Sequence, residues 1–373
     1  MSPVPPDNAY RITDHYYAVI MAGGGGTRLW PLSRHKRPKQ MLAMFDERSM
    51  FQTAVDRILD LFPPERILVV TVQEQATELQ AQRPLIPTEN FLIEPQARGT
   101  ASVIGLAAAV LQLRDPQAIM AVLGSDHFMT NELAFRQVLR AAAQAAQDGY
   151  LATLGIQPTF ASSGFGYIQK GAYLGEVDGH ALYQVARFKE KPAPLEAEAL
   201  LAGGQHYWNS GMFIWRVERI LAEIERQMPV LYSGLREIQA AWDSPAAQSV
   251  VERLWLSLLN ETIDFGIMEH AERVVVLPAA DLGWSDIGSW DSLFDLLKGD
   301  EHGNIVMGGE NIALETTNSL VYTHQPRRLI VTIGVDNLVI VDTGDVLLVC
   351  DRQQAQQVRT VVRQLKDSGK EYL

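Results

Sequence analysis

The sequence contains only one cysteine, Cys350, among its 373 residues. One thiol cannot form an internal disulfide or a cysteine-based zinc site, which excludes a disulfide-stapled fold and a zinc finger. None of the eight histidines belongs to a His-Glu-x-x-His segment, so a zinc hydrolase of that type is not supported either. We expect Cys350 to act as a small buried hydrophobic residue.

The chain also lacks an excess of positive charge, a long apolar run and a secretory leader. Its formal net charge of -12 disfavours a protein that binds nucleic acid through the phosphates. No apolar run reaches the ~18 residues of a membrane span, and the proline-rich start lacks a basic stretch followed by an apolar core. We therefore expect a cytoplasmic protein with neither nucleic acid nor membrane as a partner, in which a few clustered cations can still bind a small anion.

Short apolar runs alternate with helical patterns over the first 150 residues. Strands are predicted at 17–21, 67–72, 91–93 and 119–123, and helices at 50–61, 100–113 and 132–146. This alternation predicts βαβ units, and hence an α/β fold with a Rossmann-like, mostly parallel open sheet flanked by helices.

The pattern changes twice further along the chain. After about residue 150 we expect an insertion with strands at 166–170 and 182–188 and a helical stretch at 217–242, broken at Pro229. Residues 304–349 are rich in β-branched types and turn signals, and 353–367 read as a polar helix. The expected division is a flexible N-terminal arm at 1–15, a catalytic domain at 16–300 and a β-rich domain at 301–373 ending in a helix, with a short left-handed β-helix as one form of that domain.

The strongest local signal is a glycine-rich segment directly after the first predicted strand, Ala22-Gly23-Gly24-Gly25-Gly26-Thr27-Arg28. Glycines let the backbone approach an anion and point amide groups at it, at the strand end where open α/β sheets bind nucleotides. A plain glycine-rich turn is the alternative. A P-loop is excluded because Arg28-Leu29 stands where Lys-Ser or Lys-Thr is required, and the small residue of a dinucleotide fingerprint is missing too.

Four basic residues follow this loop: Arg34, Lys36, Arg37 and Lys39. A cationic cluster behind a glycine loop suits a triphosphate whose leaving group gains charge. A run of charges is more often a solvated surface, but its place beside the loop favours the phosphate interpretation. Pro38 would fix the backbone so that Lys39 points inward.

Two aspartates are candidate metal ligands. Asp126 follows the predicted strand at 119–123, and Asp286 lies in the segment Gly283-Trp284-Ser285-Asp286. Mg²⁺ usually takes one or two carboxylates together with substrate phosphates, which these two residues could provide. Either aspartate alone is as consistent with a turn or a helix cap. We assign no role to His127.

Together these motifs resemble the sugar-phosphate nucleotidyltransferase family. The loop Gly-Gly-x-Gly-Thr-Arg-Leu-x-Pro-Leu-Ser and the following Pro-Lys-Gln carry the likeness. The fuller form, with Trp30, Ser33-Arg34 and Arg37-Pro38-Lys39-Gln40, is similar to the mannose-1-phosphate guanylyltransferase branch. The likeness spans residues from about 17 to 350, with its motifs in the expected order.

The resemblance implies a role for each matching residue. Asp126 and Asp286 would hold a catalytic Mg²⁺, or Mn²⁺. In the sugar pocket, Glu190 would bind hydroxyls, Lys191 the 1-phosphate and Asn209 the sugar, with Gly166 allowing close approach. The implied nucleotide contacts are Ala22, Gly23, Gly24, Gly25, Gly26, Thr27, Arg28, Lys39, Glu94, Arg98, Thr100 and Ser125. Three positions depart from the family pattern, namely Gly99 for asparagine, Gly124 for proline and, in the sugar pocket, Phe165 for tyrosine. The first two leave the guanine contacts open.

The implied reaction transfers GMP from GTP to α-D-mannose 1-phosphate and yields GDP-mannose and pyrophosphate. Lys191 would hold the attacking phosphate, while Arg28 and Lys39 would stabilise the pyrophosphate. The resemblance also implies a homodimer joined through the C-terminal β structure.

Three alternatives remain open: another sugar 1-phosphate (heptose or glucose) or another nucleotide, an inactive regulatory homologue, and a bifunctional enzyme that also isomerises mannose 6-phosphate. The short tail and the lack of a histidine cluster lead us to expect a single activity.

Overall fold

The computed structural model describes residues 12–24, 26–325 and 327–373. Residues 1–11 of the expected N-terminal arm and the expected nucleotide contact at Gly25 lie outside the described residues. The chain forms two compact units that do not follow its order. The first unit comprises the residues up to Gly23, Val55–Ser125 and Thr130–Gly283, and the second comprises Gly24–Ala54, Asp126–Met129 and Trp284–Leu373. The expected domain division near residue 300 stays a prediction.

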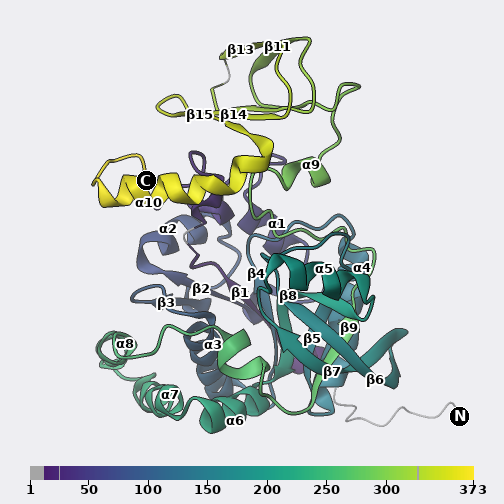
Figure 1. The fold of residues 1–373 in the computed structure, drawn as a ribbon. Coiled ribbons are helices and arrows are strands. Elements are labelled where there is room, and N and C mark those ends of the chain that lie inside the picture. The colour runs from purple at the N-terminus through teal and green to yellow at the C-terminus, as the bar shows by residue number, and fades with distance from the viewer. Residues whose placement is uncertain (1–11, 25, 326) are drawn as a thin grey trace, which may run out of the picture. The chain divides into compact units, whose positions relative to one another are not determined.

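A nine-stranded sheet, in the order β3-β2-β1-β4-β8-β5-β9-β7-β6, forms the centre of the first unit (Figure 1). Its strands are β1 (Tyr16–Met21), β2 (Ile67–Val72), β3 (Phe91–Glu94), β4 (Ile119–Gly124), β5 (Leu151–Ile156), β6 (Tyr167–Val177), β7 (His180–Lys189), β8 (His206–Arg216) and β9 (Val274–Pro278).

The first four strands of this order are parallel, as the βαβ pattern predicts. β1 pairs in parallel with β2 and with β4, so their carboxyl ends lie at the same edge. Beyond β4 the pairings are mostly antiparallel, beginning with β4 against β8. The residues after 150 therefore extend the same sheet, and the strands expected at 166–170 and 182–188 correspond to β6 and β7. β5 and β8 were not recognised because both are buried through most of their length and so lack the polar alternation of a half-exposed strand.

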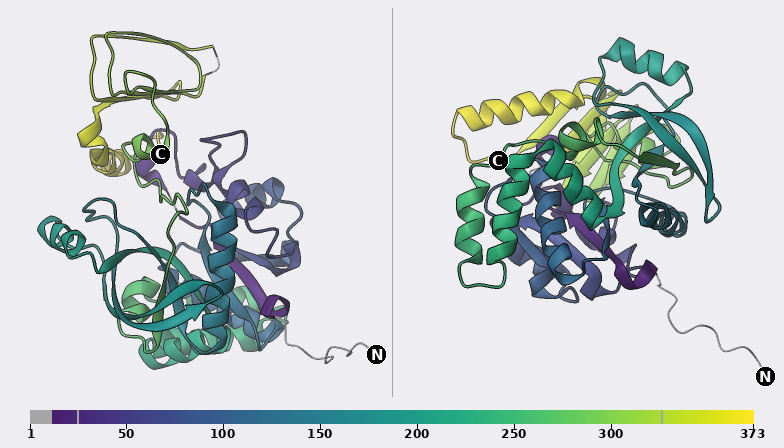
Figure 2. Two further views of the ribbon diagram at one scale, coloured as in Figure 1. Left: turned by 90° about the vertical axis from the view of Figure 1, so that its right-hand side faces the viewer. Right: turned by 90° about the horizontal axis from the view of Figure 1, so that it is seen from below.

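Helices cover the two faces of the sheet because alternate residues of the parallel strands face opposite sides (Figure 2). Val19 of β1 belongs to the core that includes α3, whereas the Tyr16 hydroxyl donates to the carbonyl of Leu139 in α4. The helices of this unit are α2 (Gln73–Gln82), α3 (Thr100–Arg114), α4 (Glu132–Gln147), α5 (Pro194–Ala202), α6 (Val217–Gln227), α7 (Pro229–Ala241) and α8 (Ala247–Trp255), with a π-helix, η6, at Asp264–Met268. Helix α1 (Met50–Asp56) is shorter than the predicted helix at 50–61 and crosses the boundary between the units.

Stacked short strands form the C-terminal part of the second unit. β10 (Ile305–Met307), β12 (Leu320–Thr323) and β14 (Leu338–Asp342) pair in parallel, and β15 (Leu347–Asp351) joins β14 antiparallel. β11 (Glu310–Leu314) and β13 (Leu329–Ile333) form a second parallel pair. Parallel pairing at this regular spacing produces the β-helical coils visible in Figure 1.

Tryptophans connect the glycine-loop segment to the rest of the second unit. The Trp290 indole donates to the carbonyl of Trp30 at 3.0 Å, and the Trp30 indole donates to the carbonyl of Tyr372 at 2.7 Å. Leu29 and Tyr322 belong to the same core. The unit also holds α9 (Leu293–Leu296) and α10 (Val358–Asp367), and α10 is preceded by a 3-10 turn, so the predicted helix at 353–367 begins later than expected. Among the described residues, no helix is long and apolar enough to cross a membrane.

Candidate active site

Two glycines of the loop allow the chain to come close to other groups. A Cβ on Gly26, whose φ is +48°, would lie 2.8 Å from both the Cβ and the backbone nitrogen of Lys39. A Cβ on Gly23 would lie 2.5 Å from Oε1 of Glu94. Both distances are shorter than van der Waals contact, so larger residues would displace Lys39 or Glu94.

A cavity of about 350 Å³ in the second unit brings together several predicted site residues. Its lining consists of Gly26, Thr27, Arg28, Lys39, Asp126, His127, Asp286, Ile287 and Gly288. The side chain of Lys39 is buried, and its Nζ lies 2.9 Å from Oδ2 of Asp126. The same ammonium donates to the backbone carbonyl of Asp286. Lys39 therefore contacts the carboxylate of Asp126 and the backbone of Asp286.

The charge of Asp126 is set by two opposing effects. Burial favours the neutral form, but the Lys39 ammonium and His127 outweigh it and hold the pKa of Asp126 below its ordinary value. Asp126 is therefore an ionised carboxylate, as a metal ligand must be.

The cavity fits a divalent cation bound mainly by its substrates. Within the described ranges, no group of three or more His, Cys, Asp or Glu side chains gathers at one point. Asp126 and Asp286 still share one cavity, and a single ammonium already contacts both residues. Two aspartates with phosphate and water oxygens make the oxygen-rich coordination that Mg²⁺ prefers.

The basic run behind the loop does not act as one cluster. The guanidinium of Arg34 binds both carboxylate oxygens of Asp345 at 2.6 and 2.7 Å, so it holds the C-terminal β structure. Lys36 and Arg37 are exposed, and of the four only Lys39 lines the cavity. The phosphate interpretation of this cluster therefore does not extend to Arg34, because a carboxylate 311 residues away in sequence binds its guanidinium.

Arg359 of α10 is a nearby cation that the sequence analysis missed. Burial and the positive charge of Arg28 lower the pKa of Arg359, and the charge of Asp286 raises it. Nothing in the polar pattern of α10 marks this residue.

Glu94, a predicted nucleotide contact, lies in the first unit. It is 2% exposed at the end of β3, and its Oε2 accepts a hydrogen bond from the backbone N–H of Arg98 at 3.2 Å. Burial raises the pKa of Glu94 to about 7. A carboxyl group held in this state is a candidate for ligand recognition.

Three other predicted nucleotide contacts have their side chains bound within the protein. A guanidinium nitrogen of Arg98 donates to the carbonyl of Leu256 at 2.8 Å. Oγ1 of Thr100 accepts from the N–H of Ile263 at 2.9 Å, and the Ser125 hydroxyl donates to the carbonyl of Met21 at 2.8 Å. Their nucleotide role stays a prediction.

Gly99, which replaces the family's usual asparagine, lies directly against the backbone of Glu261. A Cβ at this position would overlap the carbonyl oxygen of Glu261. The segment at Glu261 therefore occupies the space that a side chain at residue 99 would need.

The predicted sugar-pocket residues converge in the first unit. A Cβ on Gly166 would overlap Oε2 of Glu190 and would lie 3.3 Å from the Cβ of Asn209. Lys191 has a φ of +42°, unusual before a proline, and its Nζ lies 2.9 Å from Oε1 of Glu190. Such strain in a non-glycine residue is typical of functional sites.

Asp264 is a member of this group that the sequence analysis missed. Its Oδ1 accepts a hydrogen bond from Nδ2 of Asn209 at 2.6 Å. Burial and the neighbouring Glu190 carboxylate raise the pKa of Asp264 to about 6. The sequence around it, Ile263-Asp264-Phe265, contains no motif that could have revealed it.

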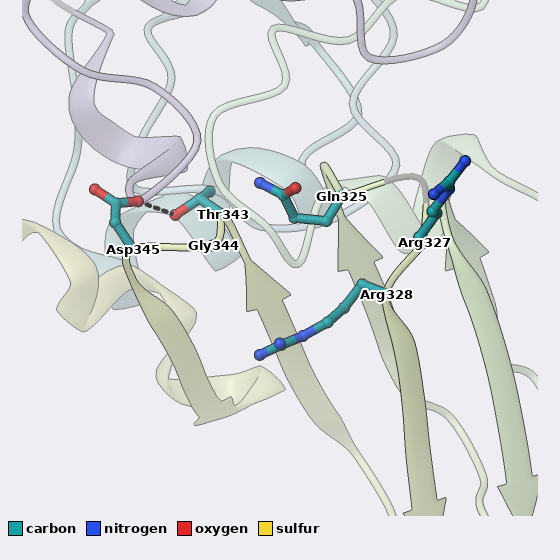
Figure 3. Close-up of a pocket in the computed structure, with 6 residues that line it drawn as sticks. All are labelled: Gln325, Arg327, Arg328, Thr343, Gly344 and Asp345. Carbon is teal, nitrogen blue, oxygen red and sulfur yellow. Dashed lines mark hydrogen bonds between the residues drawn. The ribbon is translucent and has the colours of Figure 1, made fainter.

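A separate hollow of about 830 Å³ lies on the C-terminal β structure (Figure 3). Arg328 on its edge is paired with the buried Asp342 at 2.6 Å, and Asp345 is bound by Arg34. These charged groups already form ion pairs within the protein, so we propose no ligand site here.

Comparisons with known proteins show the family of the chain. Residues 17–303 match the family described as Nucleotidyl transferase, and residues 309–365 match the MannoseP isomerase/GMP-like beta-helix domain. Mannose-1-phosphate guanylyltransferases from Klebsiella pneumoniae and Escherichia coli (strain K12) are each 37% identical, over 94% and 95% of this chain and 74% of their own length.

Solved structures show the same fold. A crystal structure from Thermus thermophilus, described as a mannose-1-phosphate geranyltransferase, superposes with a TM-score of 0.84 and 34% identity, over 94% of this chain and 99% of that one. The chain belongs to the nucleotidyl transferase family and, within it, to the mannose-1-phosphate guanylyltransferases.

Proposed function

We propose that this protein transfers GMP from GTP to α-D-mannose 1-phosphate and releases GDP-mannose and pyrophosphate. Family membership supports the reaction class and the substrates. The single observation that carries the proposal from the chain's own residues is the one cavity lined by Arg28, Lys39, Asp126 and Asp286, in which Lys39 binds the Asp126 carboxylate.

Glu94 is the residue we propose for recognising guanine. Guanine presents two adjacent N–H donors, and an ionised carboxylate can only accept hydrogen bonds. Uracil and thymine present one donor between two acceptors, which a carboxylate would repel. The buried position of Glu94 next to Gly23 makes an unmatched base costly.

The cavity residues bind and neutralise the triphosphate. A Mg²⁺ held by Asp126 and Asp286 would supply charge stabilisation at the phosphates when bound. Arg28 and Lys39 stabilise the negative charge that the pyrophosphate gains as it leaves. Since the phosphate of the sugar substrate is already ionised at neutral pH, no residue has to act as a general base.

The sugar-pocket residues orient the nucleophile. Glu190 and Asn209 bind hydroxyls, and Gly166 leaves room for the ring beside them. Lys191 leaves its contact with Glu190 to hold the 1-phosphate, which reduces the repulsion between the two phosphate groups.

A grid of four nucleotides (GTP, ATP, UTP and dTTP) against sugar 1-phosphates (mannose, glucose and a heptose), scored by pyrophosphate release, tests this proposal. We expect the highest kcat/KM for GTP with mannose 1-phosphate. Turnover with UTP or dTTP equal to that with GTP would contradict the role of Glu94. No turnover with any pair of substrates would point to the regulatory alternative. Adding Mn²⁺ in place of Mg²⁺ decides the metal preference in the same assay.

We also propose that the protein is a homodimer. The outward residues of β11 and β13 form an apolar row of Ile312, Leu314, Leu329, Val331 and Ile333, each 47–64% exposed. The strands pair in register, with Ile312 opposite Val331 and Leu314 opposite Ile333. A second copy can cover this row through a twofold axis, since the same surface then faces itself.

Light scattering during size-exclusion chromatography tests the dimer. We expect a dimer for the unmodified chain and a monomer for Val331→Lys/Ile333→Lys, with Arg363→Glu on α10 as an exposed control. A monomeric unmodified chain would refute the proposal. The cytoplasmic location expected from the sequence stays a prediction.

A further inference from the structure

The amide group of Asn209 is held at both of its ends. Nδ2 donates to Oδ1 of Asp264 at 2.6 Å, and Oδ1 of Asn209 accepts from the N–H of Gly211 at 3.1 Å. Rotating the amide by half a turn would place its oxygen against the Asp264 carboxylate and its NH₂ group against an N–H donor. The orientation is therefore fixed, and with it the direction of the second hydrogen on Nδ2.

The Glu190 carboxylate of the same pocket acts on the charge of Asp264. Burial, and then the charge of Glu190, raise the pKa of Asp264 to about 6, while Lys191 acts in the opposite direction. Two interacting carboxylates are costly in an empty pocket. They suit a ligand with several hydroxyl donors, because each hydroxyl can donate to one carboxylate.

The backbone around Asp264 is anchored on the start of α3. The N–H of Ile263 donates to Oγ1 of Thr100 at 2.9 Å, and the carbonyl of Glu261 accepts from the N–H of Ala101 at 3.2 Å. The absence of a side chain at Gly99 lets the Glu261 backbone lie in contact there. Asp264 then begins the π-helix η6, a helix type that is frequent at functional sites.

We propose that Asp264 is a positioning residue of the sugar pocket, which orients the Asn209 amide and, with Glu190, forms the acceptor set for adjacent hydroxyls of the hexose. This inference rests on the proposed function, because it assigns the substrate end of the same reaction. Asp264 acts on the affinity for the sugar phosphate and leaves the nucleotide and phosphate-transfer steps unchanged.

A double-mutant cycle on Asp264→Ala and Asn209→Ala tests the proposal in the full-length protein. Each single change should raise the KM for mannose 1-phosphate by about 10- to 100-fold, the range for a lost hydrogen bond to a charged group. The rise in the double variant should be clearly smaller than the product of the two single rises, because both single changes remove the hydrogen bond between Asp264 and Asn209. The KM for GTP should stay within about twofold in every variant.

A conservative variant and a control separate positioning from general damage. Asp264→Asn keeps the volume and one acceptor oxygen, so it should raise the same KM by only about 3- to 10-fold; this variant decides the question if Asp264→Ala does not fold. Glu272→Ala, on an exposed glutamate of the same region, should behave as the unmodified chain.

Three results would overturn the proposal: an unchanged KM for the sugar phosphate in Asp264→Ala and Asp264→Asn, additive effects in the cycle, or an equal rise of the KM for GTP. Failure of the proposed function looks different, because the unmodified chain would then not use mannose 1-phosphate at all. In that case the cycle is measured with whichever sugar 1-phosphate the unmodified chain uses.

Discussion

The proposed phosphate cavity and sugar pocket each contain an aspartate whose ionised form is disfavoured by burial. The pKa values of these two aspartates are nevertheless shifted in opposite directions. Asp126 has a pKa below its ordinary value because the Lys39 ammonium lies 2.9 Å from it. Asp264 has a pKa of about 6 because burial and the charge of the Glu190 carboxylate raise it by more than Asn209 and Lys191 lower it. Burial alone would raise the pKa of both aspartates.

The difference fits the two kinds of ligand in the proposed function. A carboxylate that is kept ionised suits a phosphate-bound cation, while a pair of carboxylates that repel each other suits neutral hydroxyl donors. The neighbouring charges, Lys39 in one place and Glu190 in the other, therefore separate the two tasks.

The largest effect on activity is expected from removing the Asp126 carboxylate from the proposed phosphate cavity. Asp126→Ala should lower kcat by about 10³-fold or more, since it removes a group that stabilises transition-state charge. Circular dichroism should show a folded protein. Asp60→Ala, an exposed aspartate in an ion pair, is the matched control and should keep normal turnover. Near-normal activity of Asp126→Ala would remove the metal role assigned to it.

A smaller effect, on KM and not on kcat, is expected in the sugar pocket. Lys191→Ala should raise the KM for mannose 1-phosphate by about 10- to 100-fold, because it removes a charged hydrogen-bond donor from the phosphate. Lys189→Ala, two residues earlier and paired with Glu196, should change this KM by less than about twofold. If both variants behave alike, Lys191 does not hold the phosphate.

Glu94 extends the comparison to pH. Its pKa of about 7 means that its acceptor form is lost as the pH falls through 7. One unit below the pKa only about a tenth remains ionised, so the KM for GTP should rise roughly five- to tenfold between pH 8 and pH 6. In Glu94→Gln this rise should be smaller, and the preference for GTP over UTP should weaken. Identical pH profiles for the two proteins would contradict the assignment.

The smallest expected effect concerns the segment that carries Asp264. Gly99→Asn restores the family's usual residue but overlaps the Glu261 backbone, so it should lower the free energy of unfolding by about 1–3 kcal/mol. Gly234→Ala, whose Cβ would lie 3.5 Å from a Leu258 methyl group, is the control and should not destabilise. Denaturant unfolding measures both, and a fully stable Gly99→Asn would show that the segment is free to move.

The sequence alone could predict the site residues that lie in glycine-containing motifs or at the end of a strand. Gly166, Glu190 and Asn209 do converge, and Lys39 does point inward behind Pro38, because local motifs and the order of strands carry that information. The parallel half of the sheet followed from alternating apolar and helical runs for the same reason.

Contacts between residues far apart in the chain could not be predicted from the sequence. Asp264 acts through a contact with Asn209, 55 residues earlier, and Arg34 is bound by Asp345, 311 residues later. Neither pairing leaves a periodic or compositional trace in one sequence. The backbone of Glu261 against Gly99 is a further case, because a backbone contact does not depend on the residue type that provides it.

The contact between Lys39 and Asp126 also bears on how the protein responds to a chelator. Domains whose acidic ligands have no counter-charge of their own often unfold when their ion is removed. Here a buried lysine of the same chain already balances the Asp126 carboxylate. EDTA should therefore stop turnover and leave the melting temperature unchanged, and fresh Mg²⁺ should restore the rate within the mixing time.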